Sequence, residues 1–517
     1  MHPRKVLETT PSKLAVILGQ SGQALSYLEL EQRANQAAHL FRAAGITKGD
    51  RVAFALENCL DLFVFVWAAQ RSGVYYVAIS SRLKSDEIEY IVRDSGAKFL
   101  LVSDYLGNDT IASLTPSISA DVELYKLGES APGWRDWSAH LTAQPMTPIE
   151  DEGKGADMLY SSGTTGRPKG IFREIDHNRA ADAEDPSTRF VVETFKVDDQ
   201  AVYLCPAPLY HAAPLRWSME VQKLGGTVVV MERFDPENAL SLIQDYRVTH
   251  AQFVPTHFVR MLKLDESVRS RYDTTSLQMA LHAAAPCPKQ IKKAMIEWCG
   301  PILVEYYSGS ENVGMTMITS QEWLAHEGSV GRAVRGEVKI LAPSGKEVPF
   351  GEEGEIFFAN GGTFKYHNDP QKTEEATNSK GWSTLGDVGR LDEEGYLYLT
   401  DRKSFMIISG GVNIYPQEIE NLLITHDKVY DVAVIGAPDP DFGEKVVAVV
   451  QPMNWDDDTQ SLTEELIGFC KTSLSGVKVP RQIDFVESLP RADNGKLYKR
   501  QVRDRYWKTQ EPANQSL

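Results

Sequence analysis

Met158-Leu-Tyr-Ser-Ser-Gly-Thr-Thr-Gly-Arg-Pro-Lys-Gly170 is the stretch that says most about the architecture and chemistry of this chain. A short apolar run gives way to glycines, hydroxyl side chains and the cations Arg167 and Lys169. Glycine lets the backbone approach a ligand closely, and consecutive backbone N–H groups can form an anion-binding concavity. The pattern predicts a phosphate-binding loop after a short strand. Its candidate binding residues are Ser161, Ser162, Gly163, Thr164, Thr165, Gly166 and Lys169.

This loop is not the P-loop of nucleotide hydrolases, whose pattern is Gly-x-x-x-x-Gly-Lys followed by Ser or Thr. Counted from Gly163, the second glycine position holds Pro168, and Lys169 is followed by Gly170. A glycine-rich run can also be an ordinary surface turn. Motifs elsewhere in the chain have to distinguish these interpretations.

The composition is that of a multidomain globular enzyme. A chain of 517 residues exceeds the size of one hydrophobic core, so two or three domains are expected. The formal charge of −17 disfavours binding to nucleic acid. The five scattered cysteines suit reduced thiols in a cytoplasmic protein better than a disulfide framework or a zinc site. We find no secretory signal, and the most apolar run, residues 62–70, is too short to span a bilayer.

Helical and strand patterns alternate along the first 403 residues. Ser26 is placed to cap a helix, and Asp235 precedes a helix opened by Pro236. This alternation predicts a layered α/β architecture with mostly parallel sheets. The polar segment 173–188 is expected to be a mobile surface loop. The expected strands are 51–56, 74–79, 98–102, 227–231 and 250–254, and the expected helices include 25–45 and 60–71.

A second, smaller domain is expected from residue 404 to residue 517, after an N-terminal domain of residues 1–403. The charged joint Asp401-Arg-Lys403 marks the boundary. Beyond it, Pro416 opens a helix, and the runs 429–435 and 445–450 have strand composition. This mixture predicts an α+β lid domain that can move.

The run at 158–170 resembles the phosphate loop of the adenylate-forming superfamily of acyl-CoA synthetases, peptide-synthetase adenylation domains and luciferases. The chain is most similar to a bacterial acyl-CoA synthetase. The resemblance implies ATP, Mg²⁺ and coenzyme A as cofactors. Four further stretches match the family's motifs in the expected order: 305–311, 383–387, 406–420 and 490–500.

The resemblance assigns the nucleotide to the first two of these stretches, 305–311 and 383–387. Tyr307 would stack on adenine, Ser310 would approach the phosphates, and Asp387 would accept both ribose hydroxyls. Glu311 would bind Mg²⁺ with Thr165, since a hard oxygen ligand suits magnesium. The family usually has Gly at the position of Ser308. The other nucleotide-binding candidates are Glu305, Tyr306, Ser308, Ala284, Ala285, Pro286 and Arg402.

Lys496 matches the family lysine that bridges the substrate carboxylate and the α-phosphate. A cation between two anions removes the repulsion that opposes their reaction. Gly410 and Gly411 would admit the pantetheine arm of coenzyme A. Ser404 is expected to be the hinge of the lid, although the family usually has Asp or Lys there. The catalytic candidates are Lys496, Glu311, Thr165 and His211.

The acid-binding pocket is expected around His211, which matches a family histidine near the substrate carboxylate. No Asp lies between Tyr210 and Trp217 to hold an α-ammonium, so a plain carboxylic acid is favoured over an amino acid. Fatty, aryl and steroid or terpenoid side-chain acids all fit an apolar pocket. The pocket candidates are Tyr210, His211, Trp217, Phe253 and Val254.

These patterns predict an ATP-dependent acyl- or aryl-acid:CoA ligase. The reaction would form an acyl-adenylate and pyrophosphate, and then a thioester and AMP. Two alternatives stay open at this point: transfer of the acyl group to an amine or to oxygen chemistry, and a nucleotide-binding relative without turnover. The expected partners are a small carboxylic acid and coenzyme A, and a homodimer is left open.

Overall fold

The computed structural model describes residues 2–161, 168–183, 185–402, 405–455, 458–491 and 497–508. The chain divides into two compact units, which are described separately below. Unit 1 comprises Met1–Phe253, Leu264–Leu281 and Thr363–Glu374. Unit 2 comprises Val254–Lys263, His282–Gly362 and Glu375–Leu517. Among the described helices, none combines the length and the apolar composition needed to cross a membrane.

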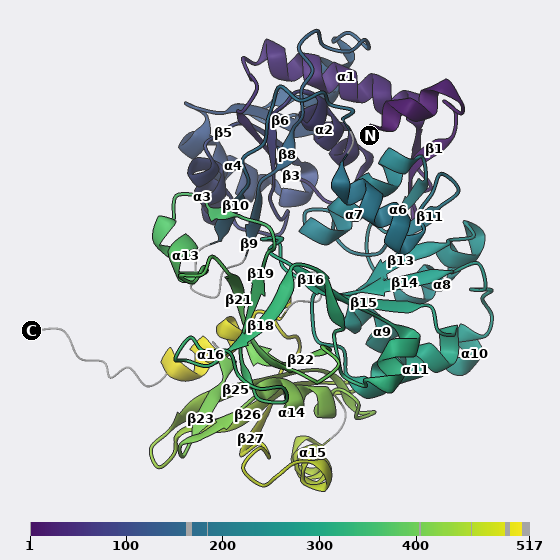
Figure 1. The fold of residues 1–517 in the computed structure, drawn as a ribbon. Helices are drawn as coiled ribbons and strands as arrows, with labels where there is room; N and C mark the ends of the chain where they lie inside the picture. Colours follow the sequence, from purple (N-terminus) through teal and green to yellow (C-terminus); the bar gives the residue numbers. More distant parts are fainter. Residues whose placement is uncertain are drawn as a thin grey trace, which may run out of the picture. The chain divides into compact units, whose positions relative to one another are not determined.

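Unit 1 contains a six-stranded sheet in the order β7-β6-β5-β3-β4-β8, in which every neighbouring pair is parallel (Figure 1). This confirms the predicted parallel α/β architecture. The strands are β3 (Arg51–Ala55), β4 (Tyr75–Ala78), β5 (Ala97–Ser103), β6 (Glu123–Leu127), β7 (Arg135–Asp136) and β8 (Ala156–Asp157). The associated helices are α1 (Tyr27–Ala43), α2 (Leu60–Arg71), α3 (Ser85–Ser95), α4 (Asn108–Ile118) and α5 (Trp137–Thr142).

Successive strand residues point to opposite sides of this sheet, and apolar side chains are buried on both sides. On one face, Ala53 and Leu100 pack with Ile91 of α3 and Leu114 of α4 in one buried cluster. On the other face, aromatic rings from strands and helices meet edge to face, as in the contact between Phe54 and Phe65. Strands buried on both faces explain why their sequences are almost entirely apolar.

A second sheet of unit 1 has the order β14-β13-β11-β12-β1-β2. The pairs β13–β11, β11–β12 and β12–β1 are parallel, and β1 pairs with β2 antiparallel. Asp235 caps α8 by accepting a hydrogen bond from the backbone of Asn238, as the sequence predicted. The strands are β1 (Leu14–Leu18), β2 (Ala24–Ser26), β11 (Val202–Cys205), β12 (Thr227–Val230), β13 (His250–Phe253) and β14 (Met279–His282). The helices are η1 (Pro3–Glu8), α6 (Pro186–Phe195), α7 (Ala212–Leu224), α8 (Pro236–Asp245) and α10 (Glu266–Arg269).

A small antiparallel sheet of unit 1 holds the strands on either side of the predicted phosphate loop. Its order is β20-β10-β9. Its elements are β9 (Leu159–Ser161), β10 (Lys169–Phe172), β20 (Lys365–Tyr366) and the adjoining helix α13 (Pro370–Glu375). The prediction of a surface loop at 173–188 overlooked α6, which begins at Pro186 after the N-cap Asp185.

Unit 2 contains the antiparallel ladder β18-β19-β21-β22 and the antiparallel strands β15, β16 and β17. The strands are β15 (Leu303–Ser308), β16 (Met315–Thr319), β17 (Arg332–Arg335), β18 (Glu337–Leu341), β19 (Gly354–Ala359), β21 (Ser383–Leu391) and β22 (Leu397–Arg402). The helices are α9 (Pro255–Leu262), α11 (Lys289–Cys299) and α12 (Ser320–Ala325).

The C-terminal part of unit 2 is a mixed sheet in the order β24-β23-β26-β25, with β27 paired to β26. One face packs on Ile419 and Leu466, and the other packs on Val502. The predicted α+β character is therefore correct. Residues 403 and 404 lie outside the described residues, so the boundary there stays a prediction. The elements are β23 (Ile407–Ser409), β24 (Val412–Ile414), α14 (Pro416–Leu423), β25 (Val429–Asp439), β26 (Gly443–Pro452), α15 (Thr459–Ser473), β27 (Gln482–Phe485) and α16 (Lys499–Lys508).

Candidate active site

The predicted phosphate loop connects β9 to β10 in unit 1. Ser161 at the end of β9 lies opposite Lys169 at the start of β10. Gly170 is required by packing, because a Cβ there would lie 2.9 Å from the ring of Tyr160. The phosphate contacts of Ser161 stay a prediction. The other loop candidates lie outside the described residues and stay predictions too: Ser162, Gly163, Thr164, Thr165 and Gly166.

Lys169, a predicted phosphate ligand, pairs with a carboxylate in this structure. Its ammonium lies 3.1 Å from Asp369 and 5.7 Å from the centroid of the Tyr366 ring. The backbone N–H of Lys372, and then Lys169, lower the pKa of Asp369. Because Asp369 is solvated, this pair is weak, and a phosphate group could compete for the ammonium.

Two residues that the sequence assigned to the nucleotide meet in unit 2. The hydroxyl of Tyr307, on β15, donates a 2.7 Å hydrogen bond to Asp387, on β21. Phe358 of β19 stacks on the Tyr307 ring at a centroid distance of 6.1 Å. Asp387 is 8% exposed, so its orientation is fixed by the fold. A ring and a fixed carboxylate acceptor side by side suit a base and its ribose.

We expect Asp387→Ala to raise the KM for ATP by about 10- to 100-fold, because hydrogen bonds to a charged acceptor contribute about 1.5–3 kcal/mol. Tyr307→Phe should raise it by about threefold to tenfold, since it removes one hydrogen bond and keeps the ring. Initial rates at varied ATP concentration measure both effects.

The matched control for these variants is Tyr398→Phe. Tyr398 also donates from its hydroxyl to a carboxylate of unit 2, Asp392, at 3.1 Å. This pair matches no nucleotide motif, so the KM for ATP should stay unchanged. A KM for ATP that is unaltered in Asp387→Ala would remove the ribose role from this residue.

The candidate magnesium ligand Glu311 lies in the turn between β15 and β16. Gly309 makes room for it, because a Cβ at that glycine would lie 2.7 Å from Glu311 Oε2 and 2.6 Å from Leu385. The residues the structure describes contain no group of three or more His, Cys, Asp or Glu that could hold a metal. A single carboxylate fits magnesium that keeps most of its waters and bridges phosphates. The backbone carbonyl of Gly314 accepts a 2.7 Å hydrogen bond from Ser308.

The predicted adenine-side loop 283–286 follows β14 directly. Ala284 has a φ of +76°, a left-handed conformation that costs a residue with a Cβ about 1 kcal/mol or more. Ala284 and Pro286 are exposed, and Ala285 is half-buried. An exposed loop that contains a strained residue is typical of a ligand contact.

A buried ion pair lies behind this loop. Lys292 of α11 is fully buried and donates to Glu305 of β15 at 2.6 Å. Burial raises the pKa of Glu305, and Lys292 opposes that shift. Burial and then Lys292 lower the pKa of His282 well below its usual range. Glu305 was predicted to bind the nucleotide, and its side chain is engaged here in anchoring the strand that carries Tyr307.

Among the acid-side candidates, Tyr210 and His211 directly precede α7, and Trp217 lies within it. His211 is the N-cap residue of this helix, and its ring lies 4.6 Å from that of Tyr210. Trp217 meets Phe195 edge to face at 4.8 Å. Phe253 and Val254 are 1% and 7% exposed. That these residues line a common acyl pocket stays a prediction.

The loop before α7 is held by one buried amide that sequence reasoning missed. Asn58 donates to the carbonyls of Ala207 at 3.2 Å and Met231 at 2.8 Å. Its oxygen accepts from the backbone N–H of Leu209 at 2.8 Å. Asn58 therefore fixes the chain just before His211.

Lys292 was also missed, although its i+3 and i+4 neighbours, Met295 and Ile296, are buried and place it on the inner face of α11.

The coenzyme A candidates form a tight hairpin. Gly410 and Gly411 have φ values of +57° and +81°, as a two-residue turn of the I′ type requires. The Gly410 N–H donates to the carbonyl of Phe442 at 2.8 Å. Arg402 ends β22 opposite Asp387 in the strand register. Ser404 and Lys496 lie outside the described residues, and their roles stay predictions.

Comparison with known proteins agrees with the motifs over the whole length of the chain. Residues 4–366 match the AMP-binding enzyme family, and residues 418–496 match the AMP-binding enzyme C-terminal domain. The feruloyl-CoA synthase of an Amycolatopsis species is 33% identical over 500 residues, covering 95% of this chain and 96% of that protein.

Solved structures give the same result. The o-succinylbenzoate CoA synthetase from Bacillus subtilis, in complex with its acyl-adenylate intermediate, is 26% identical with a TM-score of 0.80, covering 100% of this chain and 99% of that chain. The amide bond synthetase McbA from Marinactinospora thermotolerans is 26% identical with a TM-score of 0.78, covering 98% and 99%. The chain therefore belongs to the AMP-binding enzyme family, the adenylate-forming enzymes that its motifs resemble.

Proposed function

We propose that this protein is an ATP-dependent ligase that joins a carboxylic acid to coenzyme A through an acyl-adenylate. The observation that carries the proposal is the hydrogen bond from Tyr307 to Asp387. These residues are 80 positions apart in the sequence, and the family resemblance assigns them to the base and the ribose. Full-length similarity to a feruloyl-CoA synthase and to an o-succinylbenzoate CoA synthetase supports the choice of coenzyme A as acceptor.

In the first half-reaction, a substrate carboxylate oxygen attacks the α-phosphorus of ATP, and the bond to pyrophosphate breaks. Lys496 and the phosphate loop neutralise the two anions as they approach. Glu311 and Thr165 would hold Mg²⁺, which supplies positive charge at the phosphate oxygens when bound. Tyr307 and Asp387 hold the adenosine, so the α-phosphorus has a fixed position relative to the acid.

In the second half-reaction, the thiolate of coenzyme A attacks the acyl carbonyl, and AMP leaves with the electron pair of the broken bond. The lid turns about Ser404. This rotation removes Lys496 from the reacting groups and brings the Gly410 hairpin to the path by which the thiol of coenzyme A enters. One site then serves two transition states in succession. The pantetheine arm is thin, which suits a hairpin whose turn residues carry no side chains.

We place the acid among apolar, unaminated carboxylic acids, with aryl acids as the first class to test. The absence of an Asp between Tyr210 and Trp217 in the sequence, and the aryl acid named in feruloyl-CoA synthase, support this choice. The test is pyrophosphate and AMP release with ATP across hydroxycinnamic, benzoic, fatty and steroid side-chain acids. We expect thioester formation only with coenzyme A present. No release of pyrophosphate with any acid would overturn the proposal.

Transfer of the acyl group to an amine is the second candidate. Similarity to the amide bond synthetase McbA favours keeping it in the test. Reactions with an amine in place of coenzyme A separate the two, because the products differ in mass. We also place the enzyme in the cytoplasm, since its five cysteines are scattered in the sequence with no Cys-x-x-Cys pair. A homodimer stays a prediction.

A further inference from the structure

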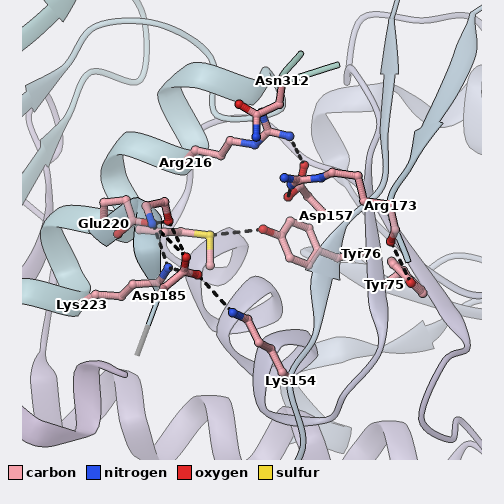
Figure 2. Close-up of polar contacts among 12 residues, drawn as sticks. Tyr75, Tyr76, Lys154, Asp157, Arg173, Asp185, Arg216, Glu220, Lys223 and Asn312 are labelled. Atoms are coloured by element: carbon pink, nitrogen blue, oxygen red, sulfur yellow. Dashed lines mark hydrogen bonds and ion pairs between the residues drawn. The ribbon is translucent and has the colours of Figure 1, made fainter. Parts of the chain in front are cut away.

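One carboxylate in unit 1 joins the phosphate-loop hairpin to the helix that carries the acid-side residues. Asp157 lies on β8, two residues before β9 begins. Its Oδ1 lies 3.2 Å from Arg173, and its Oδ2 accepts a 2.6 Å hydrogen bond from Arg216 (Figure 2). Arg173 directly follows β10, and Arg216 lies on α7. The three residues therefore come from both ends of the hairpin and from α7.

The carboxylate is the buried member of this cluster. The Asp157 side chain is 11% exposed, whereas the side chains of Arg173 and Arg216 are 34% and 30% exposed. Burial acts to raise the pKa of Asp157, but Arg216 and then Arg173 outweigh it, and the pKa lies below its usual value. The carboxylate is thus ionised at neutral pH, and breaking the cluster would leave a buried charge unpaired.

Two tyrosines of β4 contact the elements that carry the cluster. Asp157 lies opposite Tyr76 in the parallel pairing of β8 with β4. The hydroxyl of Tyr76 reaches Met219 of α7 at 3.4 Å, and the hydroxyl of Tyr75 donates to the carbonyl of Arg173 at 3.0 Å (Figure 2). The sheet, the hairpin base and α7 therefore form one packed group, which transmits small shifts.

We infer that Asp157 is a positioning residue for adenylation: through Arg173 and Arg216 it sets the position of the phosphate-loop hairpin relative to α7. This inference rests on the proposed function, in which the hairpin holds the phosphates and His211, at the start of α7, lies near the acid. A shift of α7 along the hairpin moves the attacking oxygen away from the α-phosphorus. The second half-reaction uses a preformed bond between acid and AMP, so it depends less on this alignment.

The test compares the two half-reactions in Asp157→Asn and Arg216→Gln. We expect pyrophosphate exchange to fall by about 10- to 100-fold, because small misplacements of reactants cost about that much. Thioester formation from supplied acyl-AMP should stay within about threefold of wild type, well below the cost of misplacing the reactants. The double variant should be no worse than the poorer single variant, because both changes break the same link. Arg216→Gln provides the result if Asp157→Asn does not fold.

Asp185→Asn is the matched control. Asp185 also pairs with two cations, Lys154 at 3.2 Å and Lys223 of α7 at 3.7 Å (Figure 2). Lys223 lies in the last turn of α7, and neither lysine belongs to the hairpin strands. This variant should lower thermal stability and leave the ratio of the two half-reactions unchanged. Equal losses in both half-reactions of Asp157→Asn, or the same selective loss in Asp185→Asn, would overturn the inference alone. A wild-type enzyme that adenylates no acid would overturn the proposed function as well.

Discussion

Lys496→Ala is expected to lower the rate of acid-dependent ATP–pyrophosphate exchange by about 10²–10³-fold, the loss that follows removal of one group stabilising a developing charge. The substrate carboxylate and the α-phosphate repel each other, and the ammonium offsets this repulsion when they come within bonding distance. Thioester formation from supplied acyl-AMP does not bring two such anions together. That rate should stay within about tenfold of wild type, so the loss is confined to the first half-reaction.

The control for this variant is Lys478→Ala in the same C-terminal region. Lys478 pairs with Glu418 at 2.6 Å on the surface, with side chains 31% and 49% exposed. Exposed pairs contribute little, so both half-reactions and the folded fraction should match wild type. If Lys496→Ala lost both half-reactions to the same extent, the lysine would have no role specific to adenylation.

The sequence predicted the fold through local patterns that require no knowledge of distant contacts. Residues 60–71 were expected as a helix, and α2 has those bounds. Ser26 caps α1 together with Glu29, as its position suggested. Apolar runs identified parallel strands because both faces of such strands are buried. The helix α6 was missed because its polar surroundings hid the start signal Asp185-Pro186.

Functional residues could be predicted only where they lie in a recognised motif. The resemblance assigned Tyr307 and Asp387 in two different motifs, and their hydrogen bond could not be predicted because it joins residues 80 positions apart. The same limit applies to Asp157, which reaches Arg216 across 59 positions. A charged residue within the apolar run 156–160 was a visible signal, but its partners depend on the fold. Tertiary pairing of charges is not encoded in local periodicity.

Glu305→Gln is expected to destabilise the protein by about 3–5 kcal/mol, because it leaves the fully buried Lys292 ammonium without its partner. Lys292→Met leaves a buried carboxyl instead. Burial already raises the pKa of Glu305, so that carboxyl can take up a proton and become neutral. The double change Lys292→Met and Glu305→Leu removes both charges and should recover most of the loss. Urea unfolding followed by tryptophan fluorescence measures these differences.

The stability of Lys292→Met, the variant that leaves a buried carboxyl, is expected to depend on pH. In Lys292→Met, the folded-state pKa of Glu305 lies above its unfolded value, so the folded state binds more protons and stability falls as pH rises. The variant should therefore be closer to wild type at about pH 5.5 than at about pH 8. Lys428→Met, at an exposed pair with Glu465, should cost less than about 1 kcal/mol at either pH. If Lys292→Met had the same small cost at both values, the buried pair would not hold β15 in place, and the orientation of Tyr307 would need another cause.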